Sequence, residues 1–136
     1  TLENLKLQLN FIKKKNFSSI FFGGIGYKPN TPSLESSFVI ELIKHCKKID
    51  LDVYYYDRYI DEKIDHAKII LELKDFYKYS SIIFLPYVDR QFNKIINLSG
   101  IIWDIWCQIE GNNVVRNSKD IEIENKSNLL YFNNNK

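Results

Sequence analysis

The feature that most constrains the fold is a set of short apolar runs in which polar and apolar residues do not alternate. These runs cover residues 19–22, 81–85 and 100–105, and residues 51–56 form a further run rich in tyrosine. A strand that packs against helices on both faces needs apolar side chains at nearly every position, as is typical of parallel sheets. The runs therefore predict the strands of a parallel sheet.

The segments between these runs have the spacing of amphipathic helices. Apolar side chains three or four positions apart predict helices over residues 2–12 and 35–49. Residues 62–78 are expected to be mostly helical, although residues 69–73 could extend instead. Strands that alternate with helices imply right-handed crossovers. We therefore expect an α/β fold, namely a Rossmann-like three-layer sandwich with a mainly parallel sheet of four or more strands.

The chain has 136 residues, 45% of them hydrophobic, which is the size and composition of one compact domain. We expect an N-terminal helix in residues 1–16, a Rossmann-like domain in residues 17–110 and a polar extension in residues 111–136 that could form a hairpin. The chain begins with Thr1 and contains no methionine. We therefore also expect a processed product or a fragment of a longer polypeptide.

Charge and hydropathy argue against several classes of protein. The 19 basic and 17 acidic residues are interspersed, so neither a nucleic-acid-binding surface nor a membrane-binding patch is predicted. The longest apolar stretch, residues 81–88, is much shorter than the ~20 residues that a membrane-spanning helix needs. No signal-peptide pattern is present at the N-terminus. These observations predict a cytoplasmic protein.

Few residues have the patterns of metal sites or catalytic centres. Cys46 and Cys107 belong to no cluster with histidine, and both are expected to be thiols in or near the core. His45 and His66 have no carboxylate or cysteine at the spacing of metal ligands. We expect no metal site and no catalytic residue in this chain. Of Trp103 and Trp106, one is expected in the core, and an exposed Trp106 would indicate an interdomain or dimer contact.

The segment most suited to a ligand is the loop after the first predicted strand, residues 23–37. Ligands of parallel α/β sheets bind beyond the carboxyl ends of the strands, and a glycine-rich loop that leads into a helix offers N–H groups to phosphate. The loop matches neither the dinucleotide fingerprint nor the Walker loop, because Pro29 follows the Gly-Ile-Gly sequence and no Gly-Lys-Ser/Thr is present. The glycines therefore have two interpretations, phosphate binding or a tight turn.

Several motifs taken together resemble a known family. Residues 24–31 read Gly-Ile-Gly-Tyr-Lys-Pro-Asn-Thr, two serines follow at 36–37, and Tyr-Tyr-Asp ends the second predicted strand at 55–57. This order is similar to that of the C-terminal, UDP-binding domain of UDP-glucose/GDP-mannose dehydrogenases. The resemblance covers residues 17–106 and is most specific at Lys28-Pro29-Asn30-Thr31. Its last element is the apolar run that ends in Asp104.

The resemblance implies a nucleotide-sugar-binding domain whose substrate-binding residues are Lys28, Asn30 and Thr31. In that family the intact enzyme oxidises a sugar C6 alcohol to a carboxylate with NAD, for polysaccharide biosynthesis. NAD and the catalytic cysteine belong to a separate domain, whose motifs are absent from these 136 residues. The chain would then bind no cofactor and catalyse nothing alone. Its expected partners are a nucleotide-sugar, an NAD-binding domain or subunit, and a second copy of the chain.

The sequence also departs from the family pattern at charged positions. Ser33 and Glu35 stand where the family has aspartate and arginine, and Arg58 stands in place of a proline. Ile105 and Trp106 replace the arginine that often follows the last strand. An alternative therefore stays open, in which the chain is a stand-alone Rossmann-like binding or protein-assembly module with a degenerate substrate site.

Overall fold

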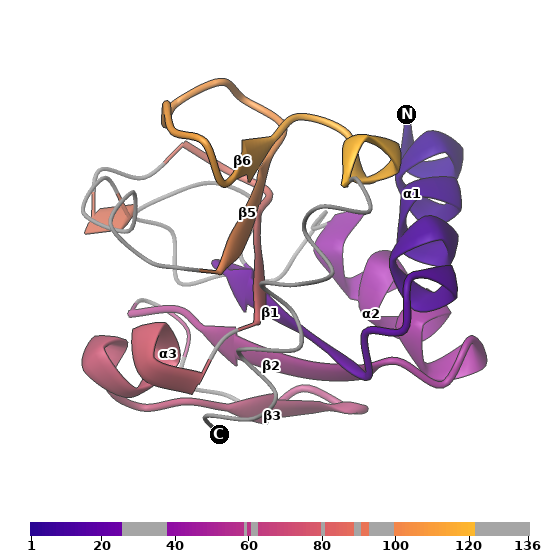
Figure 1. Cartoon of the computed structure of the whole chain (residues 1–136). Coiled ribbons are helices and arrows are strands. Elements are labelled where there is room, and N and C mark those ends of the chain that lie inside the picture. Colours follow the sequence, from indigo (N-terminus) through magenta and orange to yellow (C-terminus); the bar gives the residue numbers. More distant parts are fainter. Residues whose placement is uncertain are drawn as a thin grey trace.

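The computed structural model describes residues 1–25, 38–58, 60, 63–79, 81–88, 91–92 and 100–121. Its helices are α1 (Leu2–Lys14), α2 (Phe38–Lys48), α3 (Leu73–Tyr79) and the short 3₁₀ helix η2 (Ser118–Asp120). Its strands are β1 (Ser19–Gly23), β2 (Asp52–Tyr56), β3 (Ala67–Ile69), β4 (Ile82–Leu85), β5 (Ile101–Asp104) and β6 (Val114–Val115). Figure 1 shows how these elements follow one another along the chain.

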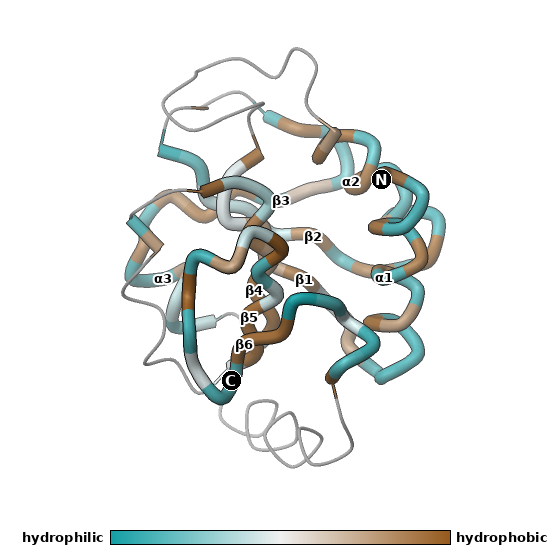
Figure 2. The backbone as a smooth tube through the Cα atoms, turned by 90° about the horizontal axis from the view of Figure 1, so that it is seen from above, coloured by the Kyte–Doolittle hydropathy of each residue, from teal (hydrophilic) through white to brown (hydrophobic). Residues whose placement is uncertain are grey.

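The strands form one sheet in the order β3-β2-β1-β4-β5-β6, and every pair of neighbours is parallel. Viewed from above, the strands lie between α1 and α2 on one side and α3 on the other (Figure 2). The prediction of a Rossmann-like α/β sandwich with a mainly parallel sheet is therefore confirmed.

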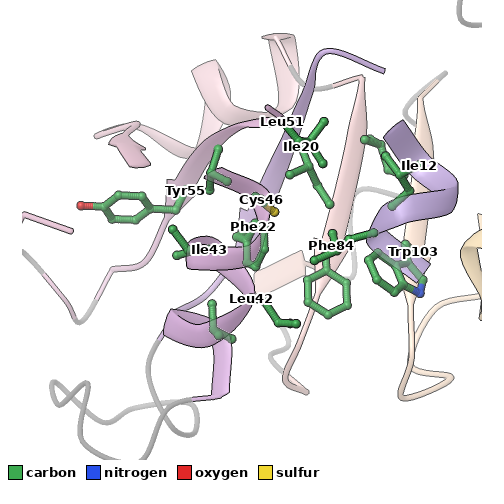
Figure 3. Close-up of a cluster of buried hydrophobic side chains, with 14 of the residues drawn as sticks. Ile12, Ile20, Phe22, Leu42, Ile43, Cys46, Leu51, Tyr55, Phe84 and Trp103 are labelled. Carbon is green, nitrogen blue, oxygen red and sulfur yellow. The ribbon is translucent and has the colours of Figure 1, made fainter. Parts of the chain in front are cut away.

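Two apolar clusters, one on each face of the sheet, account for the apolar runs in the sequence. The larger cluster packs the sheet against α1 and α2, and it contains Phe22 of β1 and Trp103 of β5 (Figure 3). The smaller cluster packs the sheet against α3 and contains Phe21, whose ring is stacked on Tyr54 at 4.8 Å between centroids. Successive residues of β1 thus enter different clusters, so no position of this strand faces water.

The helix predicted over residues 62–78 is wrong in its first half. Residues Ala67–Ile69 form β3, which pairs with β2 from Val53 to Tyr55, and the helix begins only at Leu73. The edge of β2 offers unpaired backbone groups, and pairing satisfies them in a way that a helix at this position could not. Pairing with β2 therefore decides that the chain is extended up to Ile69, before the helix begins at Leu73.

The polar segment after residue 110 adds a strand to the sheet. Val114 and Val115 of β6 pair with Ile102 and Trp103 of β5. The following turn, η2, packs on α1, where the Ser118 hydroxyl donates to the carbonyl oxygen of Gln8 at 2.5 Å. The hairpin predicted within residues 121–132 lies outside the described residues, apart from Ile121. None of the helices described here is long and apolar enough to cross a membrane.

Candidate functional site

The strand order places the topological switch point of the sheet where the sequence analysis expected a ligand. β1 lies between β2 and β4, so the chain leaves β1 towards one side of the sheet and returns to β4 on the other. The connection from β1 to β2 contains α2, which covers one face of the sheet. The connection from β3 to β4 contains α3, which covers the opposite face. The carboxyl ends of β1 and β4 are therefore the topological switch point at which α/β sheets bind ligands.

The predicted substrate-binding residues Lys28, Asn30 and Thr31 lie outside the described residues, within the gap between Ile25 and Phe38. The structure therefore describes only the two ends of their loop. One end is the carboxyl end of β1, and the other is the start of α2.

The first end of the loop is held by β2. The backbone N–H of Gly24 donates to the carbonyl oxygen of Tyr56 at 2.9 Å, and the N–H of Ile25 donates to Asp57 Oδ2 at 2.9 Å. Asp57 is the aspartate that ends the Tyr-Tyr-Asp motif, so this part of the resemblance has a structural role. It fixes the direction in which the loop leaves the sheet.

The glycines at the end of β1 are required by geometry. Gly24 has a φ of +102°, which side-chain-bearing residues rarely adopt. A Cβ on Gly23 would lie 2.8 Å from Leu85 Cδ2 and 3.1 Å from the Phe92 ring. The tight-turn interpretation of these two glycines is therefore sufficient to explain them, and they need no phosphate to account for their presence.

A buried carboxylate at the carboxyl end of β5 holds the loop that follows this strand. Asp104, the last residue of β5, is 0% exposed, and its Oδ2 accepts from Arg116 Nη1 at 2.7 Å and from the N–H of Ile109 at 2.9 Å. Its Oδ1 accepts from the N–H of Trp106 at 3.1 Å. Arg116 Nη2 donates in addition to the carbonyl oxygen of Ile109 at 2.7 Å. The loop after β5 is thus wrapped around one carboxylate.

Sequence reasoning identified Asp104 but missed Arg116. The family pattern places an arginine immediately after the aspartate, and this chain has Ile105 and Trp106 there. The structure brings a guanidinium to the same carboxylate from a position just beyond β6. The signal available in the sequence was the Val-Val pair before Arg116, which marks a short strand and hence another strand end at this edge of the sheet.

A cavity of about 450 Å³ lies beside this cluster, at the carboxyl ends of β5 and β6. It is closed on one side by the first turns of α1 and on another by the start of α2. The cavity is lined by Thr1, Leu2, Asn4, Leu5, Gln8, Phe38, Ile105, Trp106 and Arg116. It therefore lies on the same edge of the sheet as the carboxyl end of β1, although not at the switch point itself.

Trp106 stands at the wall of this cavity and is 55% exposed, whereas Trp103 is 0% exposed in the core. The expectation that one tryptophan is buried is confirmed. The indole N–H of Trp106 donates to the carbonyl oxygen of Pro86 at 2.5 Å, and Gln108 Nε2 donates to that of Tyr87 at 2.8 Å. These bonds tie the segment after β5 to the segment after β4, so the exposed ring is held in place.

The two thiols differ in their surroundings. Cys46 is fully buried on α2, and burial raises its pKa to about 12. Cys107 is exposed, which contradicts the expectation that it lies in or near the core. Its φ of 55° belongs to the turn around Asp104 that directs the chain away from the sheet. Among the described residues, no group of histidine, cysteine and carboxylate side chains is arranged to hold a metal ion.

Comparison with solved structures gives a consistent match for this architecture. The UDP-N-acetyl-mannosamine dehydrogenase Cap5O from Staphylococcus aureus matches 88% of the chain with a TM-score of 0.67 and 14% identity. GDP-mannose dehydrogenase from Pseudomonas aeruginosa matches 79% with a TM-score of 0.63 and 20% identity. A UDP-glucose dehydrogenase from Pyrobaculum islandicum matches 82% with a TM-score of 0.65 and 13% identity. The chain shares its fold with part of these dehydrogenases.

The chain spans about a third of the length of these dehydrogenases, since it covers 31% of the first and 30% of the other two. No protein-family model and no curated protein matches the sequence. At these identities the likeness concerns the fold. The resemblance predicted from residues 17–106 is therefore matched by solved structures of the same dehydrogenase group at the level of the fold.

Proposed function

We propose that this chain is the nucleotide-sugar-binding domain of a dehydrogenase of the UDP-glucose/GDP-mannose type. The observation that carries the proposal is the way the chain leaves the topological switch point. The Ile25 N–H, just after β1, donates to Asp57 at the end of β2, and the Lys-Pro-Asn-Thr motif begins three residues later in the sequence. Ligands of parallel α/β sheets bind at this switch point, which supports a role of the motif in ligand binding.

Lys28, Asn30 and Thr31 are proposed to contact the nucleotide-sugar. An ammonium group suits the diphosphate because it is a compact positive charge, and the amide and hydroxyl side chains suit the hydroxyls of the sugar. NAD and the catalytic cysteine come from another domain or subunit in this proposal. The chain alone then binds substrate without oxidising it.

Isothermal titration calorimetry with UDP, UDP-glucose and GDP-mannose tests the proposal. Half of a divided site binds weakly, so we expect a dissociation constant near 1 mM, which corresponds to about −4 kcal/mol. Lys28→Ala should weaken binding measurably. Lys47→Ala is the matched control, because Lys47 lies beside the start of β2, at the opposite edge of the sheet. No heat and no NMR shift at millimolar ligand, with Lys28→Ala identical to the parent, would remove the proposal.

The exposure of Trp106 favours a second candidate function, a protein-assembly module that keeps the fold without the ligand. An exposed tryptophan beside apolar residues is typical of protein contacts. In that case Trp106→Ala should lower the oligomeric state of the chain, as measured by sedimentation equilibrium, and no nucleotide-sugar should bind.

A further inference from the structure

We propose that the outward face of α1 is a self-association surface, on which a second copy of the chain packs its own α1 in the antiparallel direction. The inference goes beyond the proposed function and does not depend on any nucleotide-sugar. It starts from a row of four side chains three or four positions apart, which therefore follow one face of the helix: Glu3, Leu7, Phe11 and Lys14.

The other three sides of α1 are occupied by the rest of the fold. Gln8, Leu9 and Asn10 follow one another in the helix, so their side chains point in directions about 100° apart. Leu9 is buried in the larger apolar cluster against the sheet. Asn10 Oδ1 lies 2.8 Å from His45 Nε2 of α2, and Gln8 Oε1 accepts from the N–H of Ser118 in η2. The row of four side chains therefore lies on the one remaining side.

This outward side carries apolar side chains that the fold leaves in contact with water. Leu7 is 59% exposed and Phe11 is 39% exposed, one helical turn apart. Figures 1 and 2 both show α1 at the margin of the molecule. The helix dipole favours an acid in the first turn and bases in the last, which accounts for Glu3 and Lys14 within a single chain. It does not account for the two large apolar side chains between them.

The row is complementary to itself. Glu3 and Lys14 lie at nearly equal distances from the midpoint between Leu7 and Phe11. A twofold axis at this midpoint therefore places Leu7 against Phe11 of the second copy, and Glu3 beside Lys14 of the second copy. A parallel pair of helices would instead bring Glu3 beside Glu3 and Lys14 beside Lys14, which is unfavourable. The charges thus select the antiparallel arrangement.

The neighbouring helix α2 continues the same pattern. Both helices cover the same face of the sheet, and each leads into one of the parallel strands β1 and β2, so they run in the same direction. Asn10 contacts His45, so an axis at the centre of α1 crosses α2 close to Lys44. Glu41 and Lys48 are exposed on either side of this level. The twofold arrangement therefore brings Glu41 towards Lys48 of the second copy, which extends the complementary charges over two helices.

The same observations argue against a lipid surface as the occupant. A helix that lies on an anionic membrane has basic residues along its polar flanks and a broad apolar face. The apolar part of this row consists of two side chains, and the Glu3 side chain at one end is 83% exposed. An acid at one end and a base at the other are suited to a second copy of the same row.

Sedimentation equilibrium of the whole chain, up to about 1 mM, tests the proposal. A contact between two pairs of helices belongs to the small, transient class of interfaces, so we expect a dimer with a dissociation constant of about 0.1 mM. Leu7→Glu places a charge against Phe11 of the second copy, twice in each dimer, and should raise this constant at least about tenfold. Leu71→Glu is the matched control, because Leu71 is 79% exposed and lies between β3 and α3.

A pair of charge reversals tests the antiparallel arrangement itself. Glu3→Lys alone and Lys14→Glu alone each replace two attractive contacts in the dimer by two repulsive ones, so each should raise the dissociation constant by about tenfold. An equimolar mixture of the two variants should dimerise as the parent chain does, because the reversed charges of one variant then face opposite charges of the other. Far-UV circular dichroism shows that each variant keeps its helices.

The inference is overturned if the chain stays monomeric up to about 1 mM, if Leu71→Glu weakens the dimer as much as Leu7→Glu, or if the mixture of charge reversals stays monomeric. A monomer that binds vesicles of anionic phospholipid, and loses them in Leu7→Glu, identifies a lipid surface instead. A dimer that is lost in Trp106→Ala but kept in Leu7→Glu also overturns the inference and supports the protein-assembly function at Trp106. Failure of the nucleotide-sugar titrations bears on the proposed function alone.

Discussion

Substitution of Asp104 by asparagine is the sharpest test of how this edge of the sheet is built. The carboxylate is 0% exposed, and its two oxygens accept hydrogen bonds from Arg116 and from the backbone N–H groups of Trp106 and Ile109. Asparagine has nearly the same shape but only one acceptor oxygen, and its NH₂ group is a donor. In either orientation of the amide, at least one backbone N–H group then faces a donor.

The expected cost follows from these bonds. A hydrogen bond to a charged group contributes about 1.5–3 kcal/mol, and a buried donor without an acceptor costs about 1–3 kcal/mol. The Arg116 side chain is 40% exposed and can turn to water. Loss of its ion pair therefore adds little to the free-energy cost of Asp104→Asn. We expect Asp104→Asn to lower the free energy of unfolding by about 2–3 kcal/mol.

Urea unfolding followed by far-UV circular dichroism measures this change. With a slope of about 1–3 kcal/mol/M, the midpoint should fall by about 0.7–3 M at unchanged slope. Asp52→Asn is the control, because Asp52 is exposed at the start of β2 and should change stability by no more than about 0.5 kcal/mol. The reasoning is refuted if Asp104→Asn is as stable as Asp52→Asn.

Three further outcomes follow from single positions. Gly24→Ala should destabilise the fold by about 1–2 kcal/mol, because its φ of +102° disfavours a Cβ, and an unchanged urea midpoint would contradict this. An aromatic disulfide reagent should label native Cys107 rapidly and Cys46 only after unfolding, so Cys107→Ser should abolish the fast phase. Burial and then Lys6 lower the pKa of His45 from 6.5, so the unfolded chain binds this proton more readily. Stability should therefore fall as the pH drops below 6.5, and less so in His45→Gln, in paired urea titrations at two pH values.

The parallel sheet could be predicted because its signal is local. β1, β4 and β5 are buried on both faces, and so their sequences contain almost no polar residues. The face of α2 that packs on the sheet, with Val39, Leu42 and Cys46 buried, likewise follows from spacing along the chain. The same reasoning placed a glycine-containing turn at the carboxyl end of β1, where Gly24 has a φ of +102°.

The edge strands had only weaker signals, such as the Val-Val pair before Arg116, and the cavity had none. β3 and β6 have three and two residues, and each exists because a neighbouring strand offers unpaired backbone groups. Cys107 was misjudged because the chain turns after Asp104, where Cys107 has a φ of 55° and is exposed although Ile109 nearby is buried.

The sequence by itself determined which segments are buried, and therefore the four strands β1, β2, β4 and β5 and the helices α1 and α2. Spacing of apolar residues carries this information, because burial acts on each side chain through its own element. Only the tertiary structure decided that Arg116 reaches Asp104 and that Gln8 of α1 meets Ser118 of η2, 110 positions along the chain. Such pairs depend on how elements are packed in space, and no periodicity along the chain records them.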